Sequence, residues 1–333
     1  MSTVSPVILV TGATGTQGGG VVRELLKVSH STNPPTPIII HAFVRDPSSA
    51  ASQALLALDP KAVKLFQGDF DDISSLTKAA EGATATFITV QPVFTDLEAE
   101  SRHGRNILIA SLSAGVRHVI YSAVSGIDKR ESFKNVEPGS WIDIYYASKG
   151  SVIAAVKSPP VAVPADYAYT IIQPATFLTN FLPPSQAFMY PDLNKENSSI
   201  TTAFRPGLKH SYLDPDDIGR FVAHSILASP SEFREKWANK TIPLASVDFS
   251  LEEAVAALTK SVGDRKKVQI NFLKSGEAGE VAKTNPLVAS QLFINENPIS
   301  VDLEEVRSYG IPLGSVEAFF DRHKKEVEQA LGL

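Results

Sequence analysis

Residues 7 to 18 read VILVTGATGTQG, and this stretch decides the fold. Its first four residues are apolar and mostly β-branched, as in a strand buried inside a parallel sheet. Three glycines follow, at Gly12, Gly15 and Gly18, and a helical spacing of apolar residues comes directly after them. A glycine turn between a buried strand and a helix is typical of a phosphate-binding site.

Each glycine has its own physical task in such a turn. Gly12 permits the tight reversal of the chain, Gly15 lets a pyrophosphate approach the backbone, and Gly18 allows close packing of helix and strand. The N–H groups at the helix start then offer partial positive charge to the phosphates. We expect a nucleotide site here, and a glycine-rich turn without a ligand is the alternative.

The strand–helix pattern repeats along the first half of the chain. Alternating units of this kind predict a doubly wound parallel sheet, the Rossmann fold, with helices on both faces. A polar, proline-rich surface loop is expected at 29–37. The predicted strands are 7–10, 38–44, 63–67, 84–90, 118–122 and 169–173, and the predicted helices are 17–28, 48–58, 72–80, 96–114 and 141–157.

The pattern loosens after about residue 174. Helices are expected at 216–227 and 251–262, and two helical pieces at 302–331. We therefore predict an α/β protein with an NAD(P)-binding Rossmann domain over 1–174, whose core also takes in about 208–245. A smaller, discontinuous α/β substrate lobe is expected over 175–333.

Composition excludes several kinds of site. The 333 residues carry a net charge of −5 and include no cysteine, so disulfides, thiolate catalysis and zinc–thiolate sites are excluded. A mildly acidic chain gives no electrostatic reason to expect nucleic acid or membrane as a direct partner. Residues 1–6 lack the features of a signal peptide, and no apolar run approaches the ~20 residues of a membrane span. The expected location is cytoplasmic, or nuclear if the role is regulatory.

No metal site is expected from the sequence. The histidines are scattered, and no pair has metal-ligand spacing. Asp214, Asp216 and Asp217 stand at a predicted helix start, where aspartates cap the helix and complement its dipole.

The end of the second predicted strand bears on the choice of nucleotide. Arg45 stands there, followed by Asp46. An acidic residue at this place accepts from a ribose 2′-hydroxyl, whereas an arginine suits a 2′-phosphate through bidentate pairing. We therefore predict NADP(H), with NAD(H) as the alternative cofactor; an arginine paired with a surface carboxylate is the structural alternative for Arg45.

Several motifs together resemble one family. These motifs are VTGATGTQG at 10–18, VRD at 44–46, QGDFDD at 67–72, GVRHVIYS at 115–122, SKG at 148–150, YTIIQP at 169–174 and DIGR at 217–220. They resemble the NmrA-like branch of the atypical short-chain dehydrogenases/reductases over most of residues 5–260. The resemblance implies a Rossmann fold with a smaller substrate lobe. The family includes NAD(P)H-dependent reductases of quinones, enones and plant phenolics, and also regulators that bind the dinucleotide without catalysis.

The resemblance also assigns the cofactor contacts. Asp69 and Phe70 are expected beside the adenine, and Thr89, Val90 and Gln91 beside the adenosine ribose and pyrophosphate. The full predicted set is Gly12, Thr14, Gly15, Thr16, Gln17, Gly18, Arg45, Asp69, Phe70, Thr89, Val90, Gln91, Lys149, Pro174, Thr176 and Phe177.

Tyr145 and Lys149 have the Tyr-x-x-x-Lys spacing, which places both on one face of a helix. A lysine ammonium there lowers the pKa of the phenol and can bind the nicotinamide ribose. This is the proton relay of the short-chain dehydrogenases. Its serine is expected from Ser122 or Ser125, which flank the position that the resemblance indicates. The neighbouring Tyr146 leaves the choice of tyrosine open, and packing between sheet and lobe is the alternative role for Tyr145.

Aromatic residues cluster after the sixth strand, where they form either a substrate pocket or the core of the lobe. The candidate substrate residues are Gln91, Val93, Tyr145, Phe177, Asn180 and Phe181. The prediction is an NADP(H)-dependent oxidoreductase that transfers hydride to an apolar carbonyl, quinone or enone. A non-catalytic NAD(P) sensor with a protein partner and a non-redox Rossmann enzyme are the alternatives. The oligomeric state is left open.

Overall fold

The computed structural model describes residues 5–32, 35–93 and 95–333, so parts of the sequence at 1–6 and 29–37 lie outside it. The chain forms two compact units. Unit 1 comprises Met1–Val124, Ala147–Gln173 and Pro215–Ile242, and unit 2 comprises Ser125–Tyr146, Pro174–Asp214 and Pro243–Leu333. Each unit is therefore built from three separate stretches of chain.

Unit 1 is organised around a seven-stranded sheet with the order β10-β6-β5-β4-β1-β2-β3. Every neighbouring pair from β6 to β3 is parallel, which confirms the predicted Rossmann class. The strands are β1 (Val7–Val10), β2 (Ile39–Val44), β3 (Val63–Gln67), β4 (Ala85–Ile88), β5 (His118–Ser122), β6 (Ala168–Pro174) and β10 (Lys240–Leu244).

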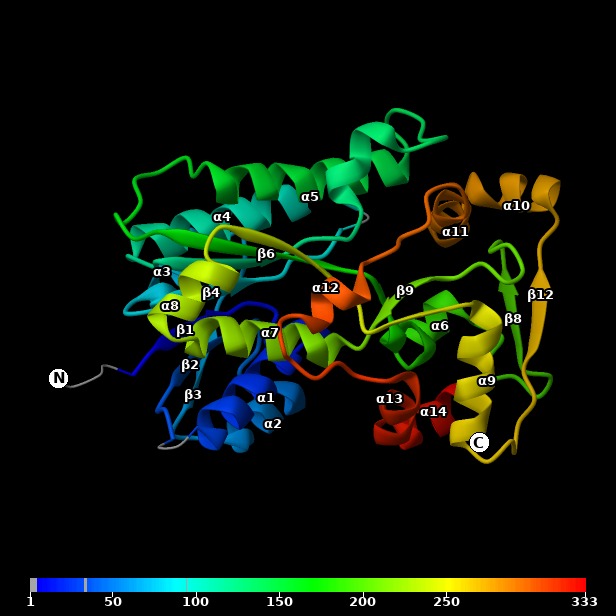
Figure 1. The fold of residues 1–333 in the computed structure, drawn as a ribbon, viewed down its shortest axis with the longest axis horizontal. Helices are drawn as coiled ribbons and strands as arrows, with labels where there is room; N and C mark the ends of the chain where they lie inside the picture. The colour runs from blue at the N-terminus through cyan, green and yellow to red at the C-terminus, as the bar shows by residue number, and fades with distance from the viewer. Residues whose placement is uncertain (1–4, 33–34, 94) are drawn as a thin grey trace. The chain divides into compact units, whose positions relative to one another are not determined.

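Helices cover both faces of this sheet, as Figure 1 shows. α3 (Ile73–Ala80), α4 (Ala99–Ser113) and α5 (Trp141–Lys157) bury apolar residues against one face. α1 (Thr16–Ser31) and α7 (Pro215–Leu227) cover the other face and pack closely against each other. Glycine makes this close approach possible, since a Cβ on Gly219 would lie 2.5 Å from the carbonyl oxygen of Gly20. Three further elements complete the unit: α2 (Ala50–Leu58), α8 (Pro230–Glu232) and η3 (Phe233–Trp237).

The first helix is longer than predicted, so the polar loop does not begin at residue 29. The hydroxyls of Ser29 and Ser31 donate back to the carbonyls of Leu26 and Lys27, at 2.9 and 2.7 Å. These bonds satisfy the polar side chains within the helix, which therefore runs on to Ser31.

Unit 2 contains two small sheets and several short helices. Its strands are β7 (Thr176–Phe177), β8 (Ser199–Thr202), β9 (His210–Leu213), β11 (Val247–Phe249) and β12 (Gln269–Phe272). They pair in the orders β11-β9-β7 and β12-β8. The helices are η1 (Ile127–Ser132), η2 (Leu178–Phe181), α6 (Ser185–Met189), α9 (Leu251–Ser261), α10 (Ser275–Ala282), α11 (Pro286–Glu296), α12 (Leu303–Arg307), α13 (Val316–Arg322) and α14 (Lys324–Leu331).

The C-terminal segment forms three helices, so the prediction of two pieces over 302–331 was wrong. Gly310 has φ +73° and Pro312 follows it, which separates α12 from α13. The Ser315 side chain then caps α13 by accepting from the backbone N–H of Ala318. A second break at His323, where φ is −104°, divides α13 from α14.

Candidate functional site

The glycine turn between β1 and α1 is tight and leaves the start of α1 exposed. Gly12 has φ +59°, which favours glycine, and its carbonyl accepts from the N–H of Gly15 at 2.9 Å. A Cβ on Gly18 would lie 2.3 Å from the carbonyl oxygen of Gly12. Thr14, Gly15 and Thr16 are exposed, and α1 begins at Thr16 without a side-chain cap. A bound anion can therefore reach the helix N-terminus.

Three hydrogen bonds fix the surroundings of this turn within unit 1. The Thr11 hydroxyl donates to the Phe87 carbonyl and accepts from the N–H of Thr89, both at 3.0 Å, and so joins the ends of β1 and β4. The Ser122 hydroxyl donates to the side-chain oxygen of Gln17 at 2.6 Å. Ser122, a candidate for the relay serine, thus lies against the first turn of α1.

Arg45 and Asp46 differ in how their side chains are engaged. The Asp46 carboxylate accepts from the backbone N–H and the hydroxyl of Ser48, at 2.8 and 2.6 Å. The Ser48 hydroxyl bond is the main reason that the pKa of Asp46 lies below its usual value. Arg45 is exposed, and no ion pair of its guanidinium occurs among the residues described. The arginine is therefore available to an anionic ligand.

The loop after β3 is held from two sides. Phe70 stacks on Phe43 with centroids 5.7 Å apart, and its carbonyl accepts from the Asn106 side chain at 2.9 Å. Asp69 is exposed, and its carboxylate accepts from the N–H of Asp71 at 2.9 Å. The predicted adenine-contacting pair consequently has a fixed backbone and one exposed side chain.

Lys149 is buried in an ion pair that the sequence did not predict. Its ammonium lies 2.7 Å from Glu100 Oε1 and donates to the carbonyl of Val90 at 3.1 Å. Lys149 is 5% exposed and Glu100 2%. The two residues are far apart in the sequence, and an acidic residue in the first turn of a helix is ordinary, so no local signal identifies Glu100 as a partner.

The two neighbouring tyrosines of α5 have different environments in unit 2. Tyr146 is buried, its hydroxyl donates to the Ser125 carbonyl at 3.2 Å, and burial raises its pKa well above the usual value. Tyr145 is half-buried and stacks on Trp141, with centroids 5.9 Å apart. Tyr145 is therefore the more accessible phenol. Ser125 is itself buried, and its N–H donates to the Pro174 carbonyl at 3.0 Å.

The remaining candidates from the second half of the chain lie around β7. Thr176 and Phe177 form this strand and are half-buried, as is Asn180. Phe181 is fully buried and stacks on Tyr190 with centroids 5.1 Å apart, in the aromatic core of unit 2. In unit 1, Gln91 is exposed and Val93 is half-buried.

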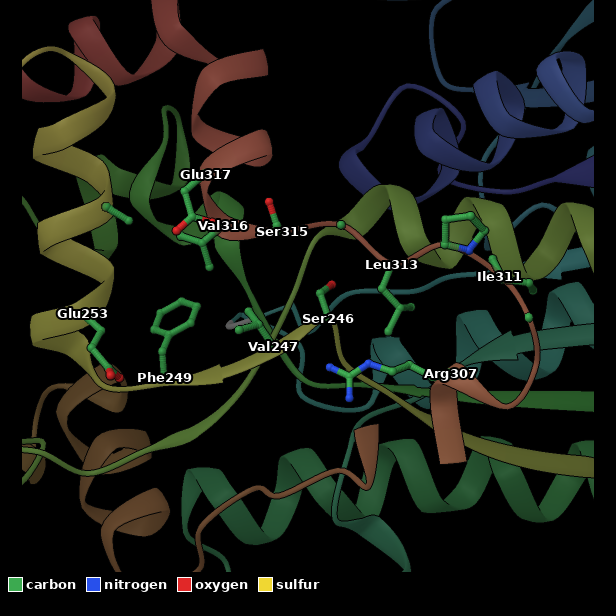
Figure 2. Close-up of a pocket in the computed structure, with 14 residues that line it drawn as sticks. Ser246, Val247, Phe249, Glu253, Arg307, Ile311, Leu313, Ser315, Val316 and Glu317 are labelled. Atoms are coloured by element: carbon green, nitrogen blue, oxygen red, sulfur yellow. The ribbon is translucent and has the colours of Figure 1, made fainter. Parts of the chain in front are cut away.

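Unit 2 also contains an open cavity of about 760 Å³, drawn in Figure 2. Its wall combines residues from β11, the start of α9 and the segment between α12 and α13. None of the predicted substrate residues lines it. Phe249 and Leu313 contribute apolar surface, and Arg307 and Glu253 contribute charge. The segments are distant in sequence, so no spacing marks this cavity.

The described part of the chain contains neither a metal-binding cluster nor a membrane-spanning helix. Over residues 5–32, 35–93 and 95–333, no group of histidine, aspartate and glutamate side chains is arranged to hold a metal ion. No helix in those same ranges has the length and apolar character needed to cross a bilayer.

A parallel sheet of this order, with a glycine turn after its strand β1, defines the dinucleotide-binding Rossmann class. The chain belongs to the NmrA-like family, whose model matches residues 5–299, and this confirms the resemblance seen in the sequence motifs.

Known proteins show the same relationship. The NmrA-like family domain-containing oxidoreductase ptmS of Penicillium ochrochloron is 30% identical over 249 residues, which are 70% of this chain and 67% of that protein. An NADPH-dependent quinone oxidoreductase from Escherichia coli, solved with NADPH, has a TM-score of 0.68 at 21% identity, covering 96% of this chain and 99% of its own. NmrA, a negative transcriptional regulator solved with NAD, has a TM-score of 0.64 at 19% identity, covering 98% and 94%. The two solved structures share the fold of this chain.

Proposed function

We propose that the protein is an NADP(H)-dependent reductase that acts on an apolar carbonyl, quinone or enone. An oxidoreductase relative and an NADPH-dependent neighbour support a nicotinamide-dependent reductase. The preference for NADP(H) rests on Arg45, whose guanidinium is exposed while the Asp46 carboxylate is engaged by Ser48. The substrate class rests on the family and on the apolar residues near β7.

The chain's own residues would hold the cofactor and move the proton. The N-terminus of α1 binds the pyrophosphate, and Arg45 pairs with the 2′-phosphate. When bound, NADPH would supply the hydride that reduces the substrate. Tyr145 donates its phenolic proton to the substrate oxygen, and Lys149 binds the ribose hydroxyls and favours the phenolate by its positive charge.

One observation carries the choice of an enzyme over a sensor. Tyr145 is the more accessible of the two adjacent tyrosines, and it precedes the buried Lys149 by one helical turn within the continuous helix α5. That spacing is the minimum needed for a phenol to act as the acid with a lysine beside it. A protein that only sensed the dinucleotide would need the lysine but not the tyrosine.

Replacing Tyr145 with phenylalanine tests this assignment. Tyr145→Phe should lower NADPH-dependent reduction on the order of 100-fold or more, because the proton donor is lost, while NADPH affinity stays nearly intact. The measurement is NADPH oxidation against a panel of quinones, enones and aromatic ketones, together with calorimetric titration of NADPH.

Tyr146→Phe is the matched control. It removes one buried hydrogen bond, so it should cost about 1 kcal/mol of stability and leave turnover in place. Unchanged turnover in Tyr145→Phe would refute the catalytic role of Tyr145. Tight NADPH binding by the wild-type protein without turnover of any panel member would instead favour a sensor.

A further inference from the structure

The buried ion pair between Lys149 and Glu100 is a feature that the proton relay does not by itself require. The ammonium lies 2.7 Å from Glu100 Oε1, and both side chains are almost fully withdrawn from solvent. A charge buried in this way is costly unless it is paired and hydrogen-bonded. Glu100 therefore balances a charge that would otherwise be unfavourable at this position.

The packing of α4 on α5 sets where Glu100 lies. Gly104 allows the two helices to approach, since a Cβ there would lie 2.7 Å from Val152 Cγ2. One turn away, the Ser101 and Ser151 hydroxyls are hydrogen-bonded at 2.7 Å. Glu100, which precedes Ser101 in the first turn of α4, thus lies in this helix interface beside Lys149.

A second contact of the ammonium comes from the segment that follows β4. Lys149 donates to the Val90 carbonyl at 3.1 Å, just after the strand ends at Ile88. A lysine side chain is long and flexible, so a single contact would not hold it in one place. The ion pair with Glu100 and the hydrogen bond to Val90 come from different elements, and together they restrict the position of the ammonium.

We infer that Glu100 is a positioning residue, which fixes the Lys149 ammonium in place to bind the nicotinamide ribose. This inference rests on the proposed function, in which Lys149 contacts the nicotinamide half of the cofactor. Glu100 itself contacts neither cofactor nor substrate, and its effect reaches the ligand only through Lys149.

A comparison of two ligands separates this role from a general structural one. NADPH includes the nicotinamide ribose, whereas adenosine 2′,5′-bisphosphate retains only the adenosine part with its phosphates. Glu100→Gln should raise the Kd of NADPH about tenfold or more at unchanged stoichiometry. The reason is that a displaced Lys149 ammonium would lose much of its contact with the nicotinamide ribose. The Kd of adenosine 2′,5′-bisphosphate should change less than about twofold, since that ligand makes no use of Lys149.

Further variants make the comparison specific. Glu100→Asp retains the negative charge and should recover most of the lost NADPH affinity. Glu98→Gln makes the same chemical change at an exposed position just before α4 and should leave both Kd values unchanged. Lys149→Met should weaken NADPH as Glu100→Gln does, and the double variant should bind it no more weakly than Lys149→Met alone.

Each outcome decides for or against the inference. Wild-type affinity in Glu100→Gln, or an equal loss for both ligands, would overturn the positioning role. If Glu100→Gln does not fold, Glu100→Gln/Lys149→Met removes both charges and should fold; failure of this double variant too would mean that the fold needs Glu100 independently of Lys149. If the wild-type protein binds adenosine 2′,5′-bisphosphate but not NADPH, the proposed function itself has failed, whatever the variants do.

Discussion

A single exposed side chain, Arg45, carries the predicted preference for NADP(H). Arg45→Ala should weaken NADPH binding on the order of tenfold to 100-fold and NADH binding much less, because only NADPH has the 2′-phosphate that an arginine pairs with. Calorimetric titration with both nucleotides measures the difference. Arg105→Ala, which removes another exposed arginine of unit 1, is the control. Equal losses for NADPH and NADH would refute the 2′-phosphate role.

Residue types alone could not separate Arg45 from Asp46, since both stand at the end of the same strand. The local bonds make the difference. Ser48 follows Asp46 by two positions, and both its backbone N–H and its hydroxyl donate to the Asp46 carboxylate. The Asp46 side chain is therefore occupied in stabilising this turn of the backbone. The ion pair of Lys149 with Glu100, in contrast, joins residues that are far apart in the sequence. No local pattern could have predicted it.

At the scale of an element, the turn between β1 and α1 leaves no room for a side chain at Gly18. Gly18→Ala should abolish dinucleotide binding and destabilise unit 1, since the added Cβ would lie 2.3 Å from the Gly12 carbonyl oxygen. The three nearest atoms all belong to the backbone of Thr11 and Gly12, which cannot move aside as a flexible side chain could. Nucleotide titration and thermal unfolding measure the two effects.

Gly279→Ala is the matched control for that substitution. Gly279 lies inside α10, and a Cβ there would meet nothing within 4 Å. Alanine should therefore stabilise this helix by about 0.5–1 kcal/mol through its higher helix propensity. A Gly18→Ala variant that binds NADPH like the wild type would contradict the role of the turn.

Elements with strong local patterns could be predicted, and those with weak patterns could not. β1 and β3 begin and end where predicted, because each is a short strand-forming run bounded by turn residues. β8 and β12 read SITT and QINF, and such short polar strands carry little periodicity. They exist because they pair with each other across a long stretch of chain, which is a tertiary effect.

At the scale of the whole molecule, buried histidines predict a loss of stability in acid. His210 is 3% exposed, and neither ring nitrogen has a hydrogen-bond partner among the residues described. It lies between Phe204 and Tyr212, with ring centroids 5.1 and 4.3 Å away. Burial lowers the pKa of His210 from its ordinary 6.5 to about 4. Between these two pKa values, His210 therefore stays neutral in the folded protein but is protonated in the unfolded chain.

The sign of the effect follows from these two pKa values. Above pH 6.5, His210 is neutral in both states and contributes no pH dependence. Between pH 6.5 and about 4, only the unfolded chain binds the proton, so stability falls as the pH falls. The loss from this one histidine is on the order of 3 kcal/mol over the whole window.

His210→Phe should remove that part of the acid sensitivity while retaining the aromatic packing. Urea unfolding at a series of pH values from 7 to 4 compares the variant with the wild type, and the difference in unfolding free energy should grow in favour of the variant as the pH decreases. Tyr212→Phe, which leaves the imidazole in place, should keep the wild-type pH dependence because burial holds the pKa of Tyr212 far above this range. Parallel curves for wild type and His210→Phe would mean that His210 takes up its proton in the folded state, and the acid loss would then belong to other groups such as His118, whose pKa burial lowers to about 3.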